Sequence, residues 1–411
     1  MKRYFFLNEQ LRTTVKYIFF EGLSKGGEQF ILIFLPVLLQ DSESQYLSIL
    51  LLISLSGLIK LVNPVNNANA IFGVIDKFSK QDILNTVFFF NLFAFIFFLS
   101  IALIFQTSFL EYYKIDSFWP IVFLTGYMFF RNFFEISSFY EVLIENHSHS
   151  MFLKNMPFFL SFLLQLVFIF LLKIDIIFGF FLAKFIAFSL IGVWVVFKGD
   201  FKPVFNFKAK IFKEVFRYSS TLWINVFVGW LMGYGALNLT KLFLEDSYSL
   251  ALGRMINLWM VLLLVANGVN NVYAPILKRK YKENYQLSVN FRNKILLSFI
   301  SLSIVGATLS YFAMKIWPLN DLKLAPFVFI ILFAQGFQYV STPFYFLANR
   351  FKKFVFVNLI CGIFVLSYSL ILFKNSSGLS INLFLSLYLI TYLVRALIIF
   401  SFSNVQIATK K

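Results

Sequence analysis

Long apolar runs, each closed by a short polar stretch, follow one another along the whole chain. A helix that crosses the hydrocarbon core of a membrane needs about 20 mostly apolar residues, whereas strands of a membrane barrel would alternate over about ten residues. The pattern therefore predicts an all-α polytopic membrane protein. Twelve transmembrane helices are expected, near residues 17–39, 46–66, 84–106, 118–142, 156–173, 175–197, 217–243, 248–275, 294–314, 324–347, 354–373 and 381–402.

The two halves of the chain share short motifs. The pattern N-x-V-N-N-x-x-A occurs at residues 63–70 and again 204 residues later at 267–274, each time closing an apolar run. Other pairs keep nearly the same offset: the G-x-x-x-G motifs Gly22/Gly26 and Gly229/Gly233, the dipeptides Phe139-Tyr140 and Phe344-Tyr345, and the residues Asn155 and Asn358. Such recurrence indicates an internal duplication, so we expect two six-helix bundles, residues 1–200 and 201–411. The paired glycines either allow close helix packing or let spans 1 and 7 bend.

The basic residues predict how the helices are oriented. The amino terminus and every second connection carry 24 Lys and Arg residues, whereas the opposite connections carry six. Because basic residues concentrate in cytoplasmic loops, both termini are expected in the cytoplasm. The same asymmetry accounts for most of the formal net charge of +17, so a nucleic-acid partner is not implied.

Composition and missing motifs exclude several classes of protein. With 60% hydrophobic and 13% charged residues, the chain is not an ordinary soluble domain, where about a quarter of residues are charged. The polar start shows no removable signal peptide. Cys361 is the only cysteine, and His147 and His149 lie in a polar loop that we interpret as solvated. No P-loop and no H-E-x-x-H motif occurs, so neither an enzyme nor a cofactor or metal site is expected.

Ionisable residues inside the predicted spans are the candidate functional residues. There are nine: Glu21, Lys25 and Glu28 in span 1, Lys60 in span 2, Arg131 and Glu135 in span 4, Lys184 in span 6, Arg254 in span 8 and Arg395 in span 12. A charge at the bilayer centre costs about 2.5–3.5 kcal/mol on insertion scales, so it usually faces a cavity or a partner. The six cations exceed the three acids by three. A positive interior suits an anionic cargo such as phosphate, pyrophosphate or carboxylate.

A structural explanation is available for some of these charges. In spans 1 and 4 an acid and a base lie four residues apart, the spacing of a helical ion pair. Lys60 lies near the cytoplasmic end of its span, within snorkelling reach of water. Arg131, Lys184 and Arg395 fall nearer mid-depth and are harder to explain in this way.

Two local motifs and the general layout carry a family resemblance. A short acidic turn at residues 41–43 leads into Gln45-Tyr46-Leu47-Ser48-Ile49-Leu50, and span 10 ends with Leu347-Ala348-Asn349-Arg350 before a basic turn. Together with a glycine-bearing span 1, twelve spans and short loops, this resembles the multidrug/oligosaccharidyl-lipid/polysaccharide exporter superfamily, and within it the Wzx-type polysaccharide flippases. The resemblance covers essentially the whole chain.

The resemblance implies two six-helix bundles around a central cavity that opens alternately to each side. Wzx-type proteins move undecaprenyl-diphosphate-linked oligosaccharide repeat units, as for O-antigen or capsule, across the bacterial inner membrane, with polysaccharide polymerase and glycosyltransferases as further partners. Head-group contacts are then expected from the interior cations, and proton or ion coupling from the acids. The expected contacts are Arg131, Lys184, Arg254 and Arg395, followed by Lys25 and Lys60, and the expected coupling residues are Glu21, Glu28 and Glu135.

Two other functions are open at this point. One is an ion-coupled exporter of a small solute or drug, although the related multidrug exporters favour acidic interiors and this one is cationic. The other is a scaffold that holds glycosyltransferases at the membrane, which explains the interior cations poorly.

Overall fold

The structure is a computed structural model. It describes residues 26–27, 31–33, 35, 43–63, 71, 74–144, 146–199, 201–205, 207–243, 246–316, 324–347, 351–374 and 381–403. Within these ranges every regular element is helical, in agreement with the predicted all-α class. The chain packs as two compact units, one of residues 23–230 and one that contains residues 231–411.

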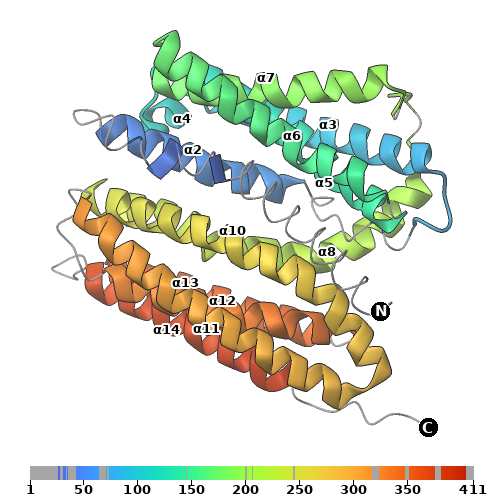
Figure 1. The fold of residues 1–411 in the computed structure, drawn as a ribbon. Helices are drawn as coiled ribbons and strands as arrows, with labels where there is room; N and C mark the ends of the chain where they lie inside the picture. The colour runs from blue at the N-terminus through green and yellow to red at the C-terminus, as the bar shows by residue number, and fades with distance from the viewer. Residues whose placement is uncertain are drawn as a thin grey trace. The chain divides into compact units, whose positions relative to one another are not determined.

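Among the residues described above, the first unit contains six helices longer than a few turns (Figure 1). They are α2 (Glu43–Val62), α3 (Lys80–Ile104), α5 (Trp119–Leu143), α6 (His147–Gln165), α7 (Ile176–Phe197) and α8 (Ala209–Leu231). The short helix α4 (Gln106–Tyr113) precedes α5, and a π-helical segment, η2 (Leu166–Leu171), extends α6. The helices α3, α5, α6 and α7 pack along one another, so that α5 is flanked by the other three.

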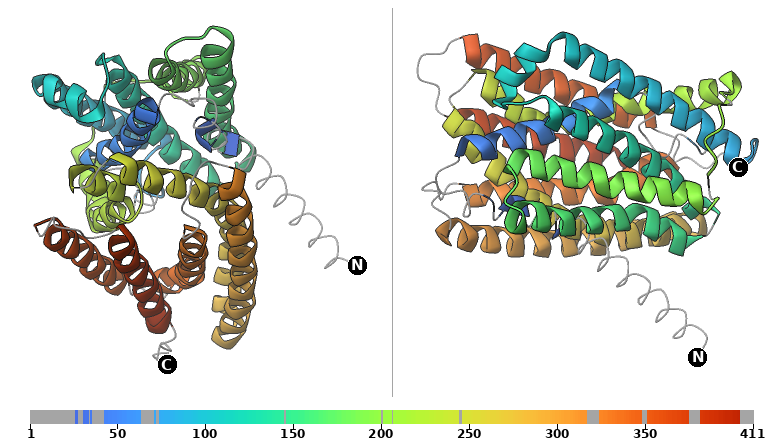
Figure 2. Two further views of the ribbon diagram at one scale, coloured as in Figure 1. Left: turned by 90° about the vertical axis from the view of Figure 1, so that its left-hand side faces the viewer. Right: turned by 90° about the horizontal axis from the view of Figure 1, so that it is seen from above.

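The second unit contains α9 (Gly235–Phe243), α10 (Asp246–Glu283), α11 (Tyr285–Ile316), α12 (Leu324–Leu347), α13 (Phe351–Lys374) and α14 (Ile381–Ser403). Helix α12 packs against α10, α11, α13 and α14, and in the right-hand view of Figure 2 the helices of this unit lie roughly lengthwise beside one another. At 38 and 32 residues, α10 and α11 extend beyond the about 20 residues that cross the hydrocarbon core.

Eight helices are long and apolar enough to cross a membrane, among the residues that the structure describes. They are Glu43–Val62, Lys80–Ile104, Ser148–Leu171, Ile176–Phe197, Tyr285–Phe312, Pro326–Tyr345, Lys352–Ile371 and Leu383–Ser403. Large apolar side chains on their outer faces are exposed, including Phe97 and Ile104 of α3, as is expected of surfaces that face lipid. The protein is therefore a multi-pass membrane protein.

The predicted number of twelve spans stays a prediction. Span 1 lies mostly outside the described residues. Spans 4 and 8 correspond to α5 and α10, which have the length but are not among the eight sufficiently apolar helices. The boundary between duplicated halves at residue 200 is also untested, because packing units and duplicated halves are different properties.

Predicted span 7 is interrupted. Helix α8 ends at Leu231, residues 232–234 form a turn, and α9 begins at Gly235. An interrupted helix leaves carbonyl groups without helical partners. The carbonyl of Met232 accepts hydrogen bonds from the hydroxyls of Tyr388 and Tyr392, both on α14. Two tyrosines therefore stabilise the break in the buried interior of the second unit.

Candidate functional site

The first unit brings three charged residues of the sequence prediction into one cluster. Glu135, on α5, accepts from two cations: its Oε2 lies 2.7 Å from Lys60 Nζ, and its Oε1 lies 3.2 Å from Arg131 Nε. Lys60 is in the last turn of α2, so the cluster joins two helices. The side chains of Lys60, Arg131 and Glu135 are 23%, 31% and 33% exposed. All three side chains are therefore partly exposed and are not sealed in the core of the unit.

Tyr127 connects this cluster to a fourth charged residue. Its hydroxyl accepts a hydrogen bond of 2.9 Å from Arg131 Nη1. Its ring centroid lies 5.2 Å from the ammonium nitrogen of Lys184 on α7. Because Tyr127, Arg131 and Glu135 recur every four residues, they share one face of α5. The face that carries the predicted ion pair thus also contacts the buried lysine.

Lys184 lies in an aromatic cage. Its side chain is 3% exposed, and its Nζ lies 4.4 Å from the ring centroid of Phe180 and 5.7 Å from that of Phe181. A desolvated cation over an aromatic face gains about 2 kcal/mol, which offsets part of the cost of burying the charge. The cage allows α7 to hold a positive charge in an otherwise apolar helix.

The cations of this unit occupy different depths. Lys184 is eight residues from the start of α7, about 12 Å along it at a rise of about 1.5 Å per residue. Arg131 is 12 residues from the start of α5, about 18 Å along it. Lys60 is in the last turn of α2. We call Lys60, Arg131, Lys184 and Glu135 the cation ladder.

The second unit holds the other two predicted cations. Arg395, on α14, is 5% exposed, and its Nε donates a 2.6 Å hydrogen bond to Asn358 Oδ1 on α13. Its Nη1 lies 3.6 Å from the sulfur of Met232, at the break between α8 and α9. Arg254 is half-buried on α10. Arg395 is therefore part of the packing around the helix break.

The remaining predicted residues lie outside the described part of the chain. These are Glu21, Lys25 and Glu28. The N-x-V-N-N-x-x-A motif of the first half is also outside it, except Asn63, whose side chain is buried and bonds to Asn91 on α3. Groups of three or more potential metal ligands are absent from the described residues.

Sequence reasoning missed the residues that hold the charges in place. Tyr127, Asn358 and the cage residues Phe180 and Phe181 were not predicted. One signal for the site in the second unit was present in the sequence. Tyr388, Tyr392 and Arg395 are spaced so that their three polar groups lie on one face of a helix. The ion pair Arg131–Glu135 is present, as its spacing indicates. Lys60 lies near the end of its span as expected, and it also forms an ion pair with Glu135 that the sequence did not indicate.

The comparisons with known proteins give a fold. No protein-family profile matches the chain, and no curated protein matches its sequence. Solved structures do match. A multidrug resistance MATE family transporter of the MOP superfamily, in its inward-facing conformation, has a TM-score of 0.68 and 11% identity over 93% of this chain and 94% of that one.

Two further structures agree. The outward-facing conformation of a MATE family transporter of the same superfamily gives a TM-score of 0.62 and 11% identity, over 96% of this chain and 94% of that one. A variant of the Vibrio cholerae MATE transporter VcmN gives a TM-score of 0.64 and 11% identity, over 96% of each chain. The chain thus has, over almost its entire length, the fold of the MATE transporters of the MOP superfamily.

Proposed function

We propose that this protein is a flippase of the bacterial inner membrane, with both termini in the cytoplasm, that moves undecaprenyl-diphosphate-linked oligosaccharide repeat units to the opposite leaflet. Alternating access is the proposed mechanism, supported by the likeness to MATE structures in inward- and outward-facing conformations. Polysaccharide polymerase and glycosyltransferases are the proposed partners. The proposed process is polysaccharide biosynthesis, for O-antigen lipopolysaccharide or for capsule.

The observation that carries this proposal is the charge of the cation ladder. Its described members are three cations and one carboxylate, a formal surplus of two positive charges. Lys25 and Glu28, which belong to the same unit but lie outside the described residues, cancel each other in formal charge. The surplus matches a diphosphate, which carries negative charge and strong acceptor oxygens. A carrier of cationic drugs would gain from the opposite sign.

The geometry suggests how a head group is exchanged. In the structure, Glu135 acts as an internal counter-ion for Lys60 and Arg131. A diphosphate that enters from the cytoplasmic side displaces this carboxylate, because it carries more negative charge than one carboxylate and its oxygens can also bind a guanidinium in a bidentate manner. Lys184 holds positive charge deeper in the unit. Because Lys184 is 3% exposed, it contacts the anion only in a conformation that opens its aromatic cage, after the anion has met Lys60 and Arg131.

Roles of the other predicted residues follow from their places. Arg254 and Arg395 are proposed head-group contacts of the second unit. Arg395 is buried by Asn358 and Met232, so it meets the ligand only in a conformation that opens this packing. Lys25 is a proposed contact, and Glu21 and Glu28, with Glu135, are proposed coupling residues.

A second candidate is an ion-coupled exporter of a small solute or drug. The fold favours it, because the solved structures described above are multidrug transporters. The two candidates differ in the sign of the cargo. A drug exporter for cations predicts that transport survives removal of the interior cations, whereas the flippase predicts that their removal abolishes transport.

Deletion of the gene, followed by fractionation of polyprenyl-linked oligosaccharides, tests the proposal. The flippase predicts that repeat units accumulate on the cytoplasmic leaflet and that surface glycan is lost. Complementation with Arg131→Ala or Lys184→Met should not restore the glycan, whereas Lys173→Met, in a connection outside the ladder, should. An unchanged lipid-linked pool after deletion would reject the flippase and favour the exporter.

A further inference from the structure

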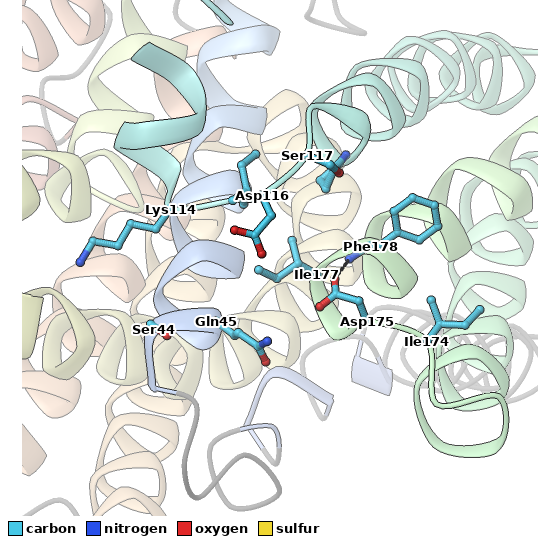
Figure 3. A pocket seen from close by; sticks show the side chains of 11 residues that line it. Ser44, Gln45, Lys114, Asp116, Ser117, Ile174, Asp175, Ile177 and Phe178 are labelled. Carbon is cyan, nitrogen blue, oxygen red and sulfur yellow. Dashed lines mark hydrogen bonds between the residues drawn. The ribbon is translucent and has the colours of Figure 1, made fainter. Parts of the chain in front are cut away.

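A cavity of about 640 Å³ lies at one end of the first unit. Its walls come from the start of α2, the connection between α4 and α5, and the connection between η2 and α7 (Figure 3). The sequence predicts that all three segments face away from the cytoplasm. Its volume is within the range of about 300–1,000 Å³ that is typical of sites for small ligands.

Polar groups line the rim of the cavity and apolar groups its floor. Ser44, Gln45, Asp116, Ser117 and Asp175 supply two hydroxyls, one amide and two carboxylates. The floor includes Ile115, Pro120 and Ile177, which are buried. A few polar groups over an apolar base are what orients a small polar ligand.

Asp175 is held in a fixed orientation. Its Oδ1 accepts a 2.8 Å hydrogen bond from the backbone nitrogen of Phe178, which caps the start of α7. A carboxylate has about four acceptor sites, so this bond leaves acceptor capacity for a ligand. Figure 3 shows Asp116 across the cavity from Asp175, with the Lys114 side chain extending away from both carboxylates.

The lining selects the chemical class of the ligand. Two carboxylates against one lysine give a net charge of minus one, which disfavours phosphate and acidic groups. Carboxylates accept hydrogen bonds from hydroxyls, while serine and glutamine both donate and accept. The half-buried ring of Phe178 adds an apolar face. Neutral, hydroxyl-rich molecules have this combination of donors, acceptors and apolar faces, and saccharides are the main biological class.

The cavity and the cation ladder share two helices. Along α7, Ile177 in the cavity and Lys184 in the ladder are about 10 Å apart, and along α5, Pro120 and Arg131 are about 16 Å apart. One unit therefore presents a saccharide-type surface and, a few helical turns deeper, an anion-type surface. We propose that the cavity is a subsite for neutral sugar residues, which receives the glycan while the ladder holds the diphosphate. This inference rests on the proposed function.

Protection from cysteine labelling tests the subsite in the full-length protein. Cys361→Ser provides a background without cysteine, and Ser117→Cys adds one thiol at the rim. We expect a membrane-impermeant maleimide, added to intact cells from outside, to label this thiol. In purified protein, maltotriose or chitotriose should slow the labelling, and the acidic trigalacturonate should not. Asp116→Asn should weaken this protection about tenfold, because it removes a charge-assisted hydrogen bond.

Matched controls separate the subsite from general effects. Thr107→Cys, on the exposed face of α4 outside the cavity, should be labelled without protection, and Glu111→Gln should leave protection at Ser117→Cys unchanged. Ser44→Cys gives a second reporter on the opposite wall if the first variant does not fold.

Four results would overturn the inference: no protection by either neutral saccharide, equal protection by trigalacturonate, equal protection at the control thiol, or full protection in the Asp116→Asn variant. Its failure is distinguishable from that of the proposed function. If gene deletion causes lipid-linked glycan to accumulate but saccharides do not protect, only the subsite is rejected. If saccharides protect but the lipid-linked pool is normal after deletion, the flippase is rejected and the sugar site stands.

Discussion

Replacement of Glu135 by Gln should change stability and ligand affinity in opposite directions. The substitution keeps the shape of the side chain and removes the charge shared by Lys60 and Arg131, at 2.7 Å and 3.2 Å. At an effective dielectric constant of about 20 and a charge separation of about 4 Å, each attraction is about 4 kcal/mol before solvation. The side chains are a quarter to a third exposed, so solvent screening reduces each contribution to about 1 kcal/mol.

Two such pairs give about 2 kcal/mol, equivalent to about a 30-fold change in a binding constant. Without ligand, Glu135→Gln should therefore be less stable than wild type by about 2 kcal/mol, because two cations lose their counter-ion. Undecaprenyl diphosphate should bind it more tightly, by up to about 30-fold, because the ligand no longer competes with a carboxylate. Purified protein in detergent allows both measurements, by thermal unfolding and by titration with the lipid.

Glu111→Gln is the matched control, because Glu111 is an exposed acid of the same unit outside the ladder. It should change neither quantity. Weaker binding of undecaprenyl diphosphate by Glu135→Gln would refute the reasoning, since it would show that the carboxylate supports the anion site. Unchanged stability would show that the two ion pairs contribute nothing to the fold.

Three further substitutions test the packing around the charges. Tyr127→Phe keeps the ring but removes the acceptor for Arg131, and should lower the free energy of unfolding by about 1–2 kcal/mol; wild-type stability would contradict this. Asn358→Leu removes the oxygen that accepts the 2.6 Å hydrogen bond from the buried Arg395. It should lower the free energy of unfolding by about 3 kcal/mol, as measured by thermal unfolding, whereas Asn358→Asp should remain near wild-type stability. Gly57→Leu should displace the ring of Trp230, which packs on Gly57. The free energy of unfolding should fall by about 1–3 kcal/mol and the tryptophan fluorescence spectrum should shift. An unshifted spectrum would argue against this contact.

The helices could be predicted from the sequence because the signal is local. Continuous apolarity over about 20 residues requires only composition, and predicted span 12, residues 381–402, matches α14 at Ile381–Ser403 almost to the residue. Span 7 was predicted as one helix over residues 217–243, but it is broken at residues 232–234 and α8 begins earlier, at Ala209. The break includes Gly233, one of the paired glycines expected either to allow close packing or to let the span bend, and it agrees with the bend, because glycine disfavours a helix interior.

The candidate site was only partly predictable, for a physical reason. Arg131 and Glu135 are neighbours on one helix, so their spacing determines that they can pair. Lys60 is 75 residues from Glu135, and no local rule connects them. The contact of Lys184 with Tyr127 depends likewise on how α5 packs against α7. Phe180 and Phe181, by contrast, lie four and three residues before Lys184 on the same helix and are local neighbours. Sequence thus indicated which residues bear charge, while tertiary packing determined their contacts.

Transport by the purified protein in liposomes tests the central claim most directly. Undecaprenyl-diphosphate-linked oligosaccharide is placed in both leaflets, and a glycosidase outside the vesicles reports how much of it becomes accessible with time. The account predicts that wild-type protein exposes nearly the whole pool, that Arg131→Ala and Lys184→Met expose only the outer half, and that Glu111→Gln behaves as wild type. Two results would contradict the claim that the cation ladder carries a lipid diphosphate across the membrane. In the first, wild-type protein exposes only the outer half of the lipid-linked oligosaccharide to the glycosidase. In the second, both cation variants expose the whole pool.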